Sequence, residues 1–346
     1  MSSLAIIRDD RYLEHNPGDG HPESPNRLRV IHDLIDREFA NLPKIAPRLA
    51  TEEELALVHD PLYIQHVANT EGKVHTQLDP DTGLSARSYE IARLAAGGLL
   101  QGVDALLNPG PRPLAPVFAF LRPPGHHAEA GHAMGFCIFN NVAIAAAYAK
   151  ETYGLKRILI VDWDLHHGNG TQHSFYDDQS VLYFSSHQYP YYPGSGNFDQ
   201  VGTGRGEGFT VNAPFPTGFG DVEYLSVYNR ILKPIALEYQ PELVLVSAGF
   251  DPYFADPLGG MRVTAEGFGA LAGLIKDIAD QTCNGKILLT LEGGYNPQGL
   301  RDGVRAVILA LQRSEPLPAE IQSSPAAEQV IERIIKVQKK YWKDLK

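Results

Sequence analysis

The stretch R-I-L-I-V-D-W-D-L-H-H-G-N-G, residues Arg157 to Gly170, predicts a buried strand that ends in polar side chains. Its aliphatic run, Ile158 to Val161, is typical of a central parallel strand that is buried on both faces. Two carboxylates and two imidazoles then follow in quick succession: Asp162, Asp164, His166 and His167. Burying such groups unpaired costs several kcal/mol each, and ligands bind at the carboxyl ends of strands in open α/β sheets. We therefore expect the floor of an active site here, with a metal ion as the partner of these side chains.

The segments on either side of this stretch alternate between apolar strands and amphipathic helices. Further buried strands are predicted at 4–7, 117–121, 181–184, 243–246 and 287–291. Helices are predicted at 26–39, from 51, from 60, and at 85–107, 140–153, 221–239 (kinked or restarted at Pro234), 264–281, 298–313 and 326–343. This alternation predicts an α/β fold of three layers, α/β/α, around a mostly parallel central sheet. We expect residues 1–346 to form a single domain, with the helix at 326–343 packed on it.

Composition and charge exclude several classes of protein. The chain has 30 Lys and Arg against 41 Asp and Glu, a net charge of −11, which argues against a nucleic-acid partner because such binding needs a basic face. The two cysteines, Cys137 and Cys283, are far apart, so neither a disulfide framework nor a thiolate zinc site is expected. No apolar run of about 18 residues and no signal peptide is present. We expect a soluble, cytoplasmic protein without a membrane partner.

Four of the predicted strands end in reactive side chains. These are His126 and His127, the group from Asp162 to His167, Asp251, and Tyr295. Because the carboxyl ends of parallel strands share one edge of a sheet, residues this far apart in sequence can meet there.

Asp164, His166 and Asp251 form the candidate metal site. Asp164 and His166 are two residues apart on the predicted strand, so their side chains would point to the same side. With Asp251 they make a set of three ligands that leaves room for water and substrate, which is typical of catalytic zinc. The same ligands also accept iron(II). A single Asp or His at a strand end is a cap or a hydrogen-bonded core residue about as often as it is a functional residue. A cluster of this kind is much less often explained by structure alone.

His126 and His127 are a separate signal. Two histidines after Pro-Pro-Gly could form a rigid polar turn, but beside a reactive strand they are typical of a general acid/base pair. Asp162 is spaced to orient one imidazole, and Asn169 could orient the other.

Five motifs, in chain order, resemble those of zinc-dependent histone deacetylases. They are R-P-P-G-H-H-A from Arg122, G-F-C-I-F-N-N from Gly135, V-D-W-D-L-H-H-G-N-G from Val161, S-A-G-F-D from Ser247 and E-G-G-Y from Glu292. W-D-L-H-H-G-N-G-T-Q resembles the class II branch and its bacterial deacetylase-like amidohydrolases. The similarity runs from His21 to Tyr295. It implies an arginase/deacetylase-like fold and removal of acetyl or other short acyl groups from acylated lysine or similar N-acyl amines by metal-activated water.

The resemblance also implies a role for individual residues. Zinc would be bound by Asp164, His166 and Asp251. His126 would pair with Asp162, His127 would be the general base and acid beside Asn169, and Tyr295 would donate to the scissile carbonyl. The substrate would contact Gly135, Phe136, Tyr192, Leu258 and Gly294, and Arg27 would lie by an inner channel for the released acid. Structural potassium would be bound by two groups of residues: Asp162, Asp164, His166, Ser185 and Ser186, and then Phe175, Asp178 and Val181.

Three other functions remain as alternatives. An acetylpolyamine amidohydrolase should carry an acidic residue where this chain has Leu258, so acylated lysine is favoured as the substrate. A binuclear manganese hydrolase of the arginase type needs a carboxylate at position 253, which is Tyr. An inactive acyl-binding protein would not need His127 and Tyr295. The partner is thus a small-molecule or peptide N-acyl amine, while the physiological substrate, the acyl chain length and the oligomeric state, a homo-oligomer included, stay open.

Overall fold

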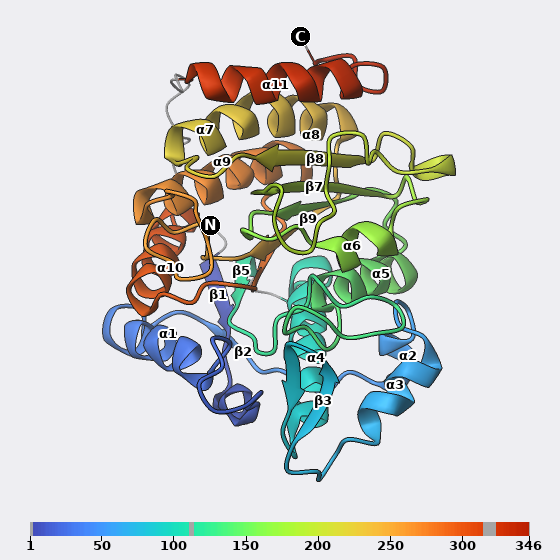
Figure 1. Ribbon diagram of the computed structural model, residues 1–346, viewed down its shortest axis with the longest axis vertical. Coiled ribbons are helices and arrows are strands. Elements are labelled where there is room, and N and C mark those ends of the chain that lie inside the picture. Colours follow the sequence, from blue (N-terminus) through green and yellow to red (C-terminus); the bar gives the residue numbers. More distant parts are fainter. Residues whose placement is uncertain (1–2, 111–113, 314–322, 346) are drawn as a thin grey trace.

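The computed structural model describes residues 3–110, 114–313 and 323–345 and is built around one eight-stranded sheet (Figure 1). Every neighbouring pair of strands in this sheet is parallel. In spatial order the strands are β2 (Lys44–Ile45), β1 (Ser3–Ile7), β5 (Leu114–Ala119), β10 (Ile287–Leu291), β9 (Leu243–Ala248), β6 (Ile158–Asp162), β7 (Val181–Gln188) and β8 (Thr210–Phe215). The prediction of a mostly parallel central sheet is confirmed.

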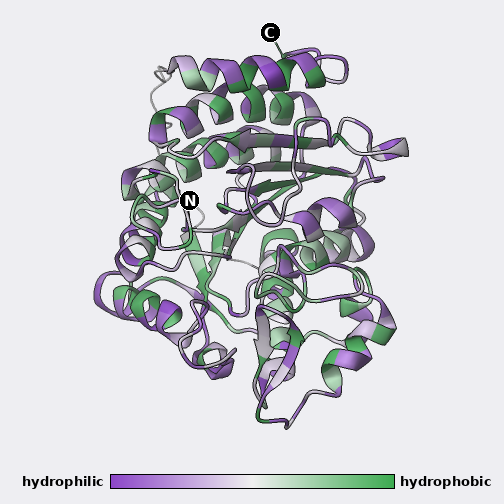
Figure 2. Ribbon diagram, in the orientation of Figure 1, coloured by the Kyte–Doolittle hydropathy of each residue, from purple (hydrophilic) through white to green (hydrophobic). Residues whose placement is uncertain are grey.

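Helices cover both faces of the sheet, which confirms the three-layer α/β/α fold. The α4 and α5 helices pack on one face, α1, α9 and α10 pack together on the other, and α11 lies over β8 and α7 (Figure 1). Hydrophobic residues concentrate on the strands and on the helix faces turned toward them (Figure 2). The helices are α1 (Pro25–Glu38), α2 (Glu52–Leu55), α3 (Pro61–Ala68), α4 (Ser88–Leu107), α5 (Asn141–Tyr153), α6 (Asn169–Ser174), α7 (Asp221–Val227), α8 (Lys233–Tyr239), α9 (Ala265–Cys283), α10 (Pro297–Leu311) and α11 (Pro325–Gln338).

The central strand β6 sets the position of the site. All of its residues are buried, as its aliphatic run predicts, and it lies between β9 and β7. The register pairs Asp162, its last residue, with Ser185 on β7 and Ser247 on β9. The β6 and β9 strands therefore end side by side, while β7 continues to Gln188, and the loops that follow β6 and β9 start close together.

Several elements were not predicted. The edge strand β8 contains Asn212 and Pro214, which weaken the apolar signal. Pro214 has no N–H to donate and is tolerated because β8 pairs only with β7. The short strand β2, the helix α6 and the antiparallel hairpin of β3 (Thr76–Asp79) and β4 (Thr82–Leu84) also lack a long periodic pattern.

The helical predictions hold, with one change at the C-terminal helix. The predicted interruption of 221–239 is present, as a π-helical turn at Tyr228–Leu232 between α7 and α8. The C-terminal helix ends at Gln338 rather than Lys343, because the chain then turns back so that the Trp342 indole donates to the Gly208 carbonyl at 3.0 Å. The predicted connections at 109–116 and 316–325 lie partly outside the described residues. Among the helices that the structure describes, none has the length and apolarity needed to cross a membrane.

Candidate active site

The loop after β6 carries two of the three candidate metal ligands. The expectation that Asp164 and His166 lie on a strand is wrong, because β6 already ends at Asp162. Side-chain to backbone hydrogen bonds shape the loop instead. The Asp162 carboxylate accepts from the Asp164 N–H at 3.1 Å, and the Asp164 carboxylate accepts from the His166 N–H at 2.9 Å. Such short Asx turns bring the second residue back beside the first, so the two side chains meet although the strand has ended.

Asp164, His166 and Asp251 converge on one point. The His166 Nδ1 lies 3.2 Å from Asp164 Oδ1 and 3.0 Å from Asp251 Oδ2. The remaining carboxylate oxygens are held by backbone, since Gly293 N–H donates to Asp164 and Leu165 N–H donates to Asp251. Donor atoms that each lie 2.0–2.2 Å from a tetrahedral ion are separated by about 3.4 Å, so this set fits a single metal ion.

The same ligands need a cation for electrostatic reasons. Asp164 and Asp251 are almost fully buried, at 1% and 0% exposure, and face the same imidazole. Burial and the neighbouring Asp164 raise the pKa of Asp251 to about 7. Two buried carboxylates at close range are costly unless a positive charge lies between them, and a divalent ion supplies it.

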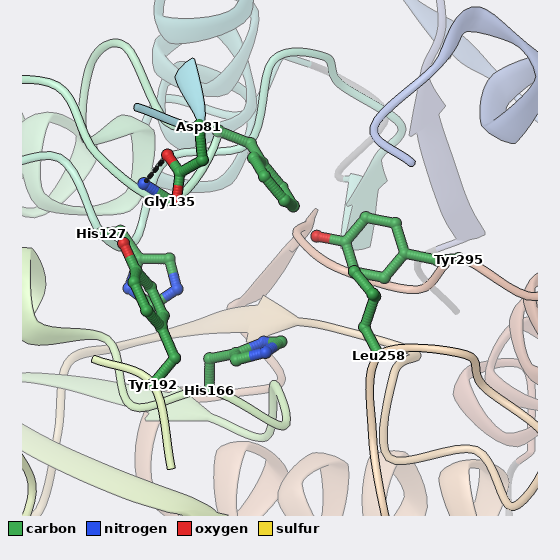
Figure 3. A pocket seen from close by; sticks show the side chains of 8 residues that line it. Asp81, His127, Gly135, His166, Tyr192, Leu258 and Tyr295 are labelled. Atoms are coloured by element: carbon green, nitrogen blue, oxygen red, sulfur yellow. Dashed lines mark hydrogen bonds between the residues drawn. The ribbon is translucent and has the colours of Figure 1, made fainter. Parts of the chain in front are cut away.

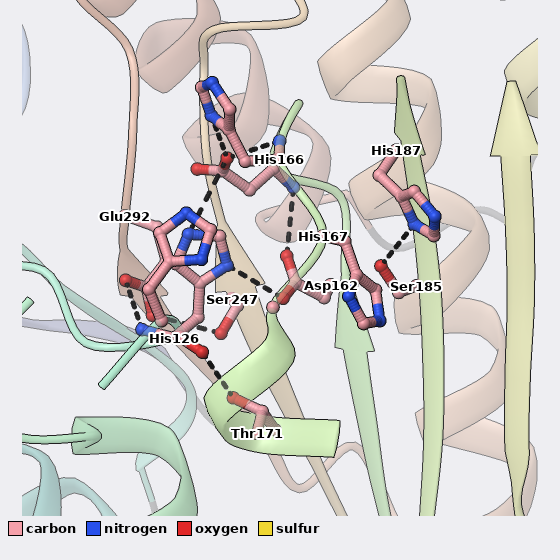
Figure 4. Close-up of polar contacts among 12 residues, drawn as sticks. His126, Asp162, His166, His167, Thr171, Ser185, His187, Ser247 and Glu292 are labelled. Atoms are coloured by element: carbon pink, nitrogen blue, oxygen red, sulfur yellow. Dashed lines mark hydrogen bonds and ion pairs between the residues drawn. The ribbon is translucent and has the colours of Figure 1, made fainter. Parts of the chain in front are cut away.

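His126 pairs directly with a carboxylate (Figure 4). Its Nδ1 donates to Asp162 Oδ2 at 3.0 Å, and that oxygen also accepts from the Tyr183 hydroxyl at 3.0 Å. Although burial opposes it, the charges of Asp164 and Asp162 raise the pKa of His126 to about 10. This imidazole therefore stays protonated near neutral pH.

His127 pairs with an amide. Its Nδ1 donates to Asn169 Oδ1 at 2.7 Å. Burial, together with the positive charges of His126 and His166, holds the pKa of His127 well below its usual range. The two adjacent histidines thus have opposite protonation states, which is the arrangement that a pair with one neutral base requires.

A cavity of about 190 Å³ opens above these residues (Figure 3). The Tyr295 hydroxyl points into it from the side opposite His127. Burial raises the pKa of Tyr295 well above its usual value, so its hydroxyl keeps its proton as a donor. The cavity is lined by Asp81, His127, Gly135, Phe136, His166, Tyr192, Leu258 and Tyr295.

Four of the five predicted substrate-binding residues line this cavity: Gly135, Phe136, Tyr192 and Leu258. Gly135 has a φ of +57°, and a Cβ at this position would lie 2.3 Å from the His127 ring, so only glycine fits. Gly294 is not among the lining residues. Its carbonyl accepts from the Arg27 guanidinium at 2.7 Å, beneath the Tyr295 ring.

The predicted potassium ligands lie along β6, β7 and the segment between them. The Ser185 hydroxyl contacts His187 Nδ1 at 2.9 Å, and Ser186 contacts the Tyr228 hydroxyl at 2.8 Å. Phe175 and Asp178 belong to the turn between α6 and β7, in which the Asp178 N–H donates to the Phe175 carbonyl. The predicted ligands are main-chain oxygens together with the Ser185 hydroxyl, and these contacts leave the prediction untested.

The sequence analysis did not predict a role for Glu292, whose carboxylate holds the loop that carries His126 and His127. Its carboxylate accepts from the N–H groups of Gly125 and His126, at 2.7 and 3.2 Å, and from the Ser247 hydroxyl at 3.0 Å (Figure 4). It therefore ties the end of β10 to β9 and to the histidine pair. The sequence signal was present, because Glu292 opens the E-G-G-Y motif directly after a buried strand.

A buried ion-pair cluster around Glu23 was missed as well. Its carboxylate pairs with the guanidinium of Arg122, which is fully buried, and with that of Arg27 at 3.1 Å. Despite burial, Arg122 and His15 hold the pKa of Glu23 well below its usual value. The cluster links the start of α1 to the loop after β5 and to the backbone before Tyr295.

Comparisons with known proteins relate this chain to a protein family. Residues 21–311 match the family model of the histone deacetylase domain. A probable deacetylase of Archaeoglobus fulgidus is 38% identical over 298 residues, covering 85% of this chain and 82% of that protein. The polyamine deacetylase HDAC10 of Homo sapiens is 41% identical over 361 residues, covering 100% of this chain and 52% of that protein. The crystal structure of the HDA15 HD domain matches with a TM-score of 0.92 at 37% identity, covering 99% of this chain and 96% of that one.

Other relatives are much longer than this chain. It spans 37% of the length of histone deacetylase 6 of Caenorhabditis elegans, to which it is 39% identical, and 42% of the length of histone deacetylase HDA1 of Candida albicans, to which it is 38% identical. The match nevertheless contains every strand end that forms the site, from His126 to Tyr295. The fold is that of the arginase/deacetylase group, and the chain belongs to the histone deacetylase family.

Proposed function

We propose that this protein is a metal-dependent amidohydrolase that removes acetyl or other short acyl groups from acylated lysine or similar N-acyl amines. One observation carries the proposal: a three-ligand metal site, a neutral imidazole and a protonated phenol surround one narrow cavity. We take residues 1–346 as a single catalytic domain located in the cytoplasm, with no nucleic-acid or membrane partner.

Asp164, His166 and Asp251 would hold the metal, zinc in our proposal. A zinc ion in this position supplies a Lewis acid that polarises the amide carbonyl and lowers the pKa of a bound water. Iron(II) accepts the same ligands, so metal analysis of the purified protein decides between the two. A binuclear arginase-type site is disfavoured because position 253 is Tyr, whose ring packs against Phe254 at 4.4 Å between centroids. The chain would also bind structural potassium at the two predicted sites, through main-chain oxygens and the Ser185 hydroxyl.

The protein side chains divide the proton transfers. Because Asn169 accepts from the Nδ1 of His127, the Nε2 of the neutral imidazole is free to take a proton from the attacking water and to return one to the departing amine. His126, whose pKa is raised by the charges of Asp164 and Asp162, would stabilise negative charge nearby. The Tyr295 hydroxyl donates to the substrate carbonyl and, more strongly, to the oxyanion that forms from it.

The cavity favours a long, unbranched amine substituent. Phe136 and Tyr192 line it with aromatic rings, and Leu258 lines its rim with an aliphatic side chain, which suits the four methylene groups of an acylated lysine. Acetylpolyamine is the second candidate substrate, supported by the 41% identity to a polyamine deacetylase over the whole of this chain. Leu258 supplies no carboxylate for a second ammonium group, which favours acylated lysine.

Steady-state kinetics on an acetyl-lysine peptide and on acetylputrescine test this proposal. We expect the wild-type protein to have the higher kcat/KM for the peptide. Leu258→Glu should shift the ratio toward acetylputrescine by about tenfold or more, because a charge-assisted hydrogen bond to the second ammonium group is worth roughly 1.4 kcal/mol or above. Leu309→Glu, an exposed change on α10, is the matched control. A wild-type preference for acetylputrescine would reverse our ranking of the two substrates.

A further inference from the structure

The amide of Asn169 can take only one orientation. Its Nδ2 lies 2.5 Å from the Glu129 carboxylate, 3.2 Å from the His127 carbonyl and 3.3 Å from the Met134 sulfur. All three neighbours accept hydrogen bonds and none donates, so the amide nitrogen must face them. The amide oxygen is therefore directed at His127 Nδ1, 2.7 Å away. As a result the hydrogen of neutral His127 is on Nδ1, and Nε2 is the unprotonated nitrogen.

Glu129 is held in place by the first turn of α6. A Cβ at Gly170 would lie 2.1 Å from the Ala128 carbonyl, so the missing side chain lets α6 pack directly on the backbone before Glu129. Asn169 and His173 are one helical turn apart and lie on the same side of α6. Both donate to the same Glu129 oxygen, His173 from its Nδ1 at 2.8 Å.

The Glu129 carboxylate stays charged in this position. Its side chain is 15% exposed, whereas the His173 ring on its outer side is 53% exposed. Although burial opposes it, the hydrogen bonds from His173 and Asn169 lower the pKa of Glu129, and the nearby His132 acts in the same direction. A charged acceptor holds the amide more firmly than a neutral one does.

We propose that Glu129 is a positioning residue for hydrolysis, which acts through Asn169 to fix the Nδ1–H tautomer of His127. This inference rests on the proposed function. It explains why an amide serves beside His127 while a carboxylate serves beside His126. Asn169 transmits the orientation that a carboxylate would impose, and it keeps the negative charge of Glu129 one side chain further from the base.

Kinetics of three variants test this role: Glu129→Gln, Asn169→Asp and the double variant. Glu129→Gln should lower kcat by about fivefold to tenfold with KM unchanged, because a charge-assisted hydrogen bond becomes a neutral one. Asn169→Asp should be impaired more, since it places two carboxylates side by side. In the double variant the new amide at position 129 can donate to the new carboxylate at position 169, which accepts from His127. Its kcat should therefore recover above that of Asn169→Asp.

Two kinetic outcomes would contradict the positioning role. A Glu129→Gln variant with wild-type kcat would overturn the proposal, as would a double variant slower than either single variant. Because Glu129→Gln also relieves the repulsion between two carboxylates, the tautomer of His127 is the measurement that separates positioning from a tether of α6. Glu151→Gln, which removes an exposed carboxylate on α5, is the charge-matched control and should keep the wild-type rate.

Ring ¹⁵N NMR of the metal-loaded protein gives a measurement that does not depend on turnover, with the His127 signals assigned by their loss in His127→Ala. The wild-type protein should show a protonated Nδ1 and an unprotonated Nε2, and Glu129→Gln should show a mixture of tautomers. An unchanged tautomer in Glu129→Gln counts against the proposal. A wild-type protein that hydrolyses no N-acyl amine would refute the proposed function instead, and the two failures are thus distinguishable.

Discussion

The side chains of Asp162 and Asn169 differ by one heavy atom, a carboxylate oxygen in place of an amide nitrogen. That difference separates the roles of the two adjacent imidazoles. The carboxylates of Asp164 and Asp162 raise the pKa of His126 to about 10. Burial holds the pKa of His127 low, and the uncharged Asn169 amide orients its ring. At this scale the chemistry depends on single atoms, so conservative substitutions are the informative ones.

Tyr295→Phe removes one hydroxyl and little else. We expect kcat to fall by roughly 100- to 1,000-fold, which is typical of losing one donor to an oxyanion, with KM changed only slightly. The ring should keep its edge-to-face contact with Phe136 and its contact with Arg27. Activity assays combined with metal analysis check this, because the metal content should stay at the wild-type level. Tyr341→Phe, far from the cavity, is the control, and an equal loss in both variants would contradict the assigned role.

At the scale of elements, three loops that follow β6, β9 and β10 approach each other more closely than side chains would allow. Gly249 and Gly293 lie in two of these loops, and a Cβ on either would meet the Asp164 carboxylate at 2.1 or 2.6 Å. Asp256 then joins the loop after β9 to the loop after β10, because it accepts from the N–H groups of Tyr295 and Asn296. The proposed metal site therefore depends on loop packing as much as on its three candidate ligands.

Gly293→Ala should damage the metal site without altering any ligand. Its new Cβ would lie 2.3 Å from Asp251 Oδ2, so the carboxylate must move. We expect metal affinity to fall by about 10- to 100-fold, which is the usual effect of disturbing the groups that support ligands. Metal titration followed by assay of the loaded protein measures it. Gly131→Ala is the control, because a Cβ there meets nothing within 4 Å, and it should bind metal normally. Normal metal affinity in Gly293→Ala would contradict the prediction.

At the scale of the whole molecule, buried neutral histidines link the stability of the fold to pH. His59 is 2% exposed and joins the loop after β5 to α5. Its Nε2 accepts from the Asn140 N–H at 2.9 Å and its Nδ1 donates to the Glu129 carbonyl at 2.9 Å. Burial lowers the pKa of His59 to about 4. Protonation of Nε2 would also remove the acceptor for Asn140.

The sign of the resulting pH dependence follows from the two pKa values. Between pH 6.5 and 4 the unfolded chain binds a proton at His59 that the folded protein excludes, so folding loses stability as the pH falls through this window. The contribution is on the order of 3 kcal/mol. In His59→Gln it should be absent, so the free energy of unfolding should depend less steeply on pH than in the wild type. Denaturant unfolding at several pH values tests this, with exposed His66→Gln as the control, and parallel curves for all three proteins would disprove it.

Much of this protein was predictable from local sequence. Apolar runs of four or five residues located the central strands, and the reactive residue types at their ends indicated His126, His127, Asp162 and the candidate metal ligands. These signals are local because a strand that is buried on both faces must be apolar throughout, and polar groups there need a partner. What the local pattern predicted poorly was the edge of the sheet, where β8 is buried but its apolar run is interrupted by Asn212 and Pro214.

Only the tertiary structure decided how these residues meet. Asp164 and His166 come together through turns in a loop rather than along a strand, and Asp251 reaches them because β9 ends beside β6. Glu129 contacts Asn169, 40 residues away in the sequence, because α6 packs against the loop after β5. No hydrophobic periodicity in the sequence predicts this packing. The physical reason is that residue type and hydrophobic period determine what a segment can form by itself. The contacts of a polar side chain depend on which loops the strand order places next to each other.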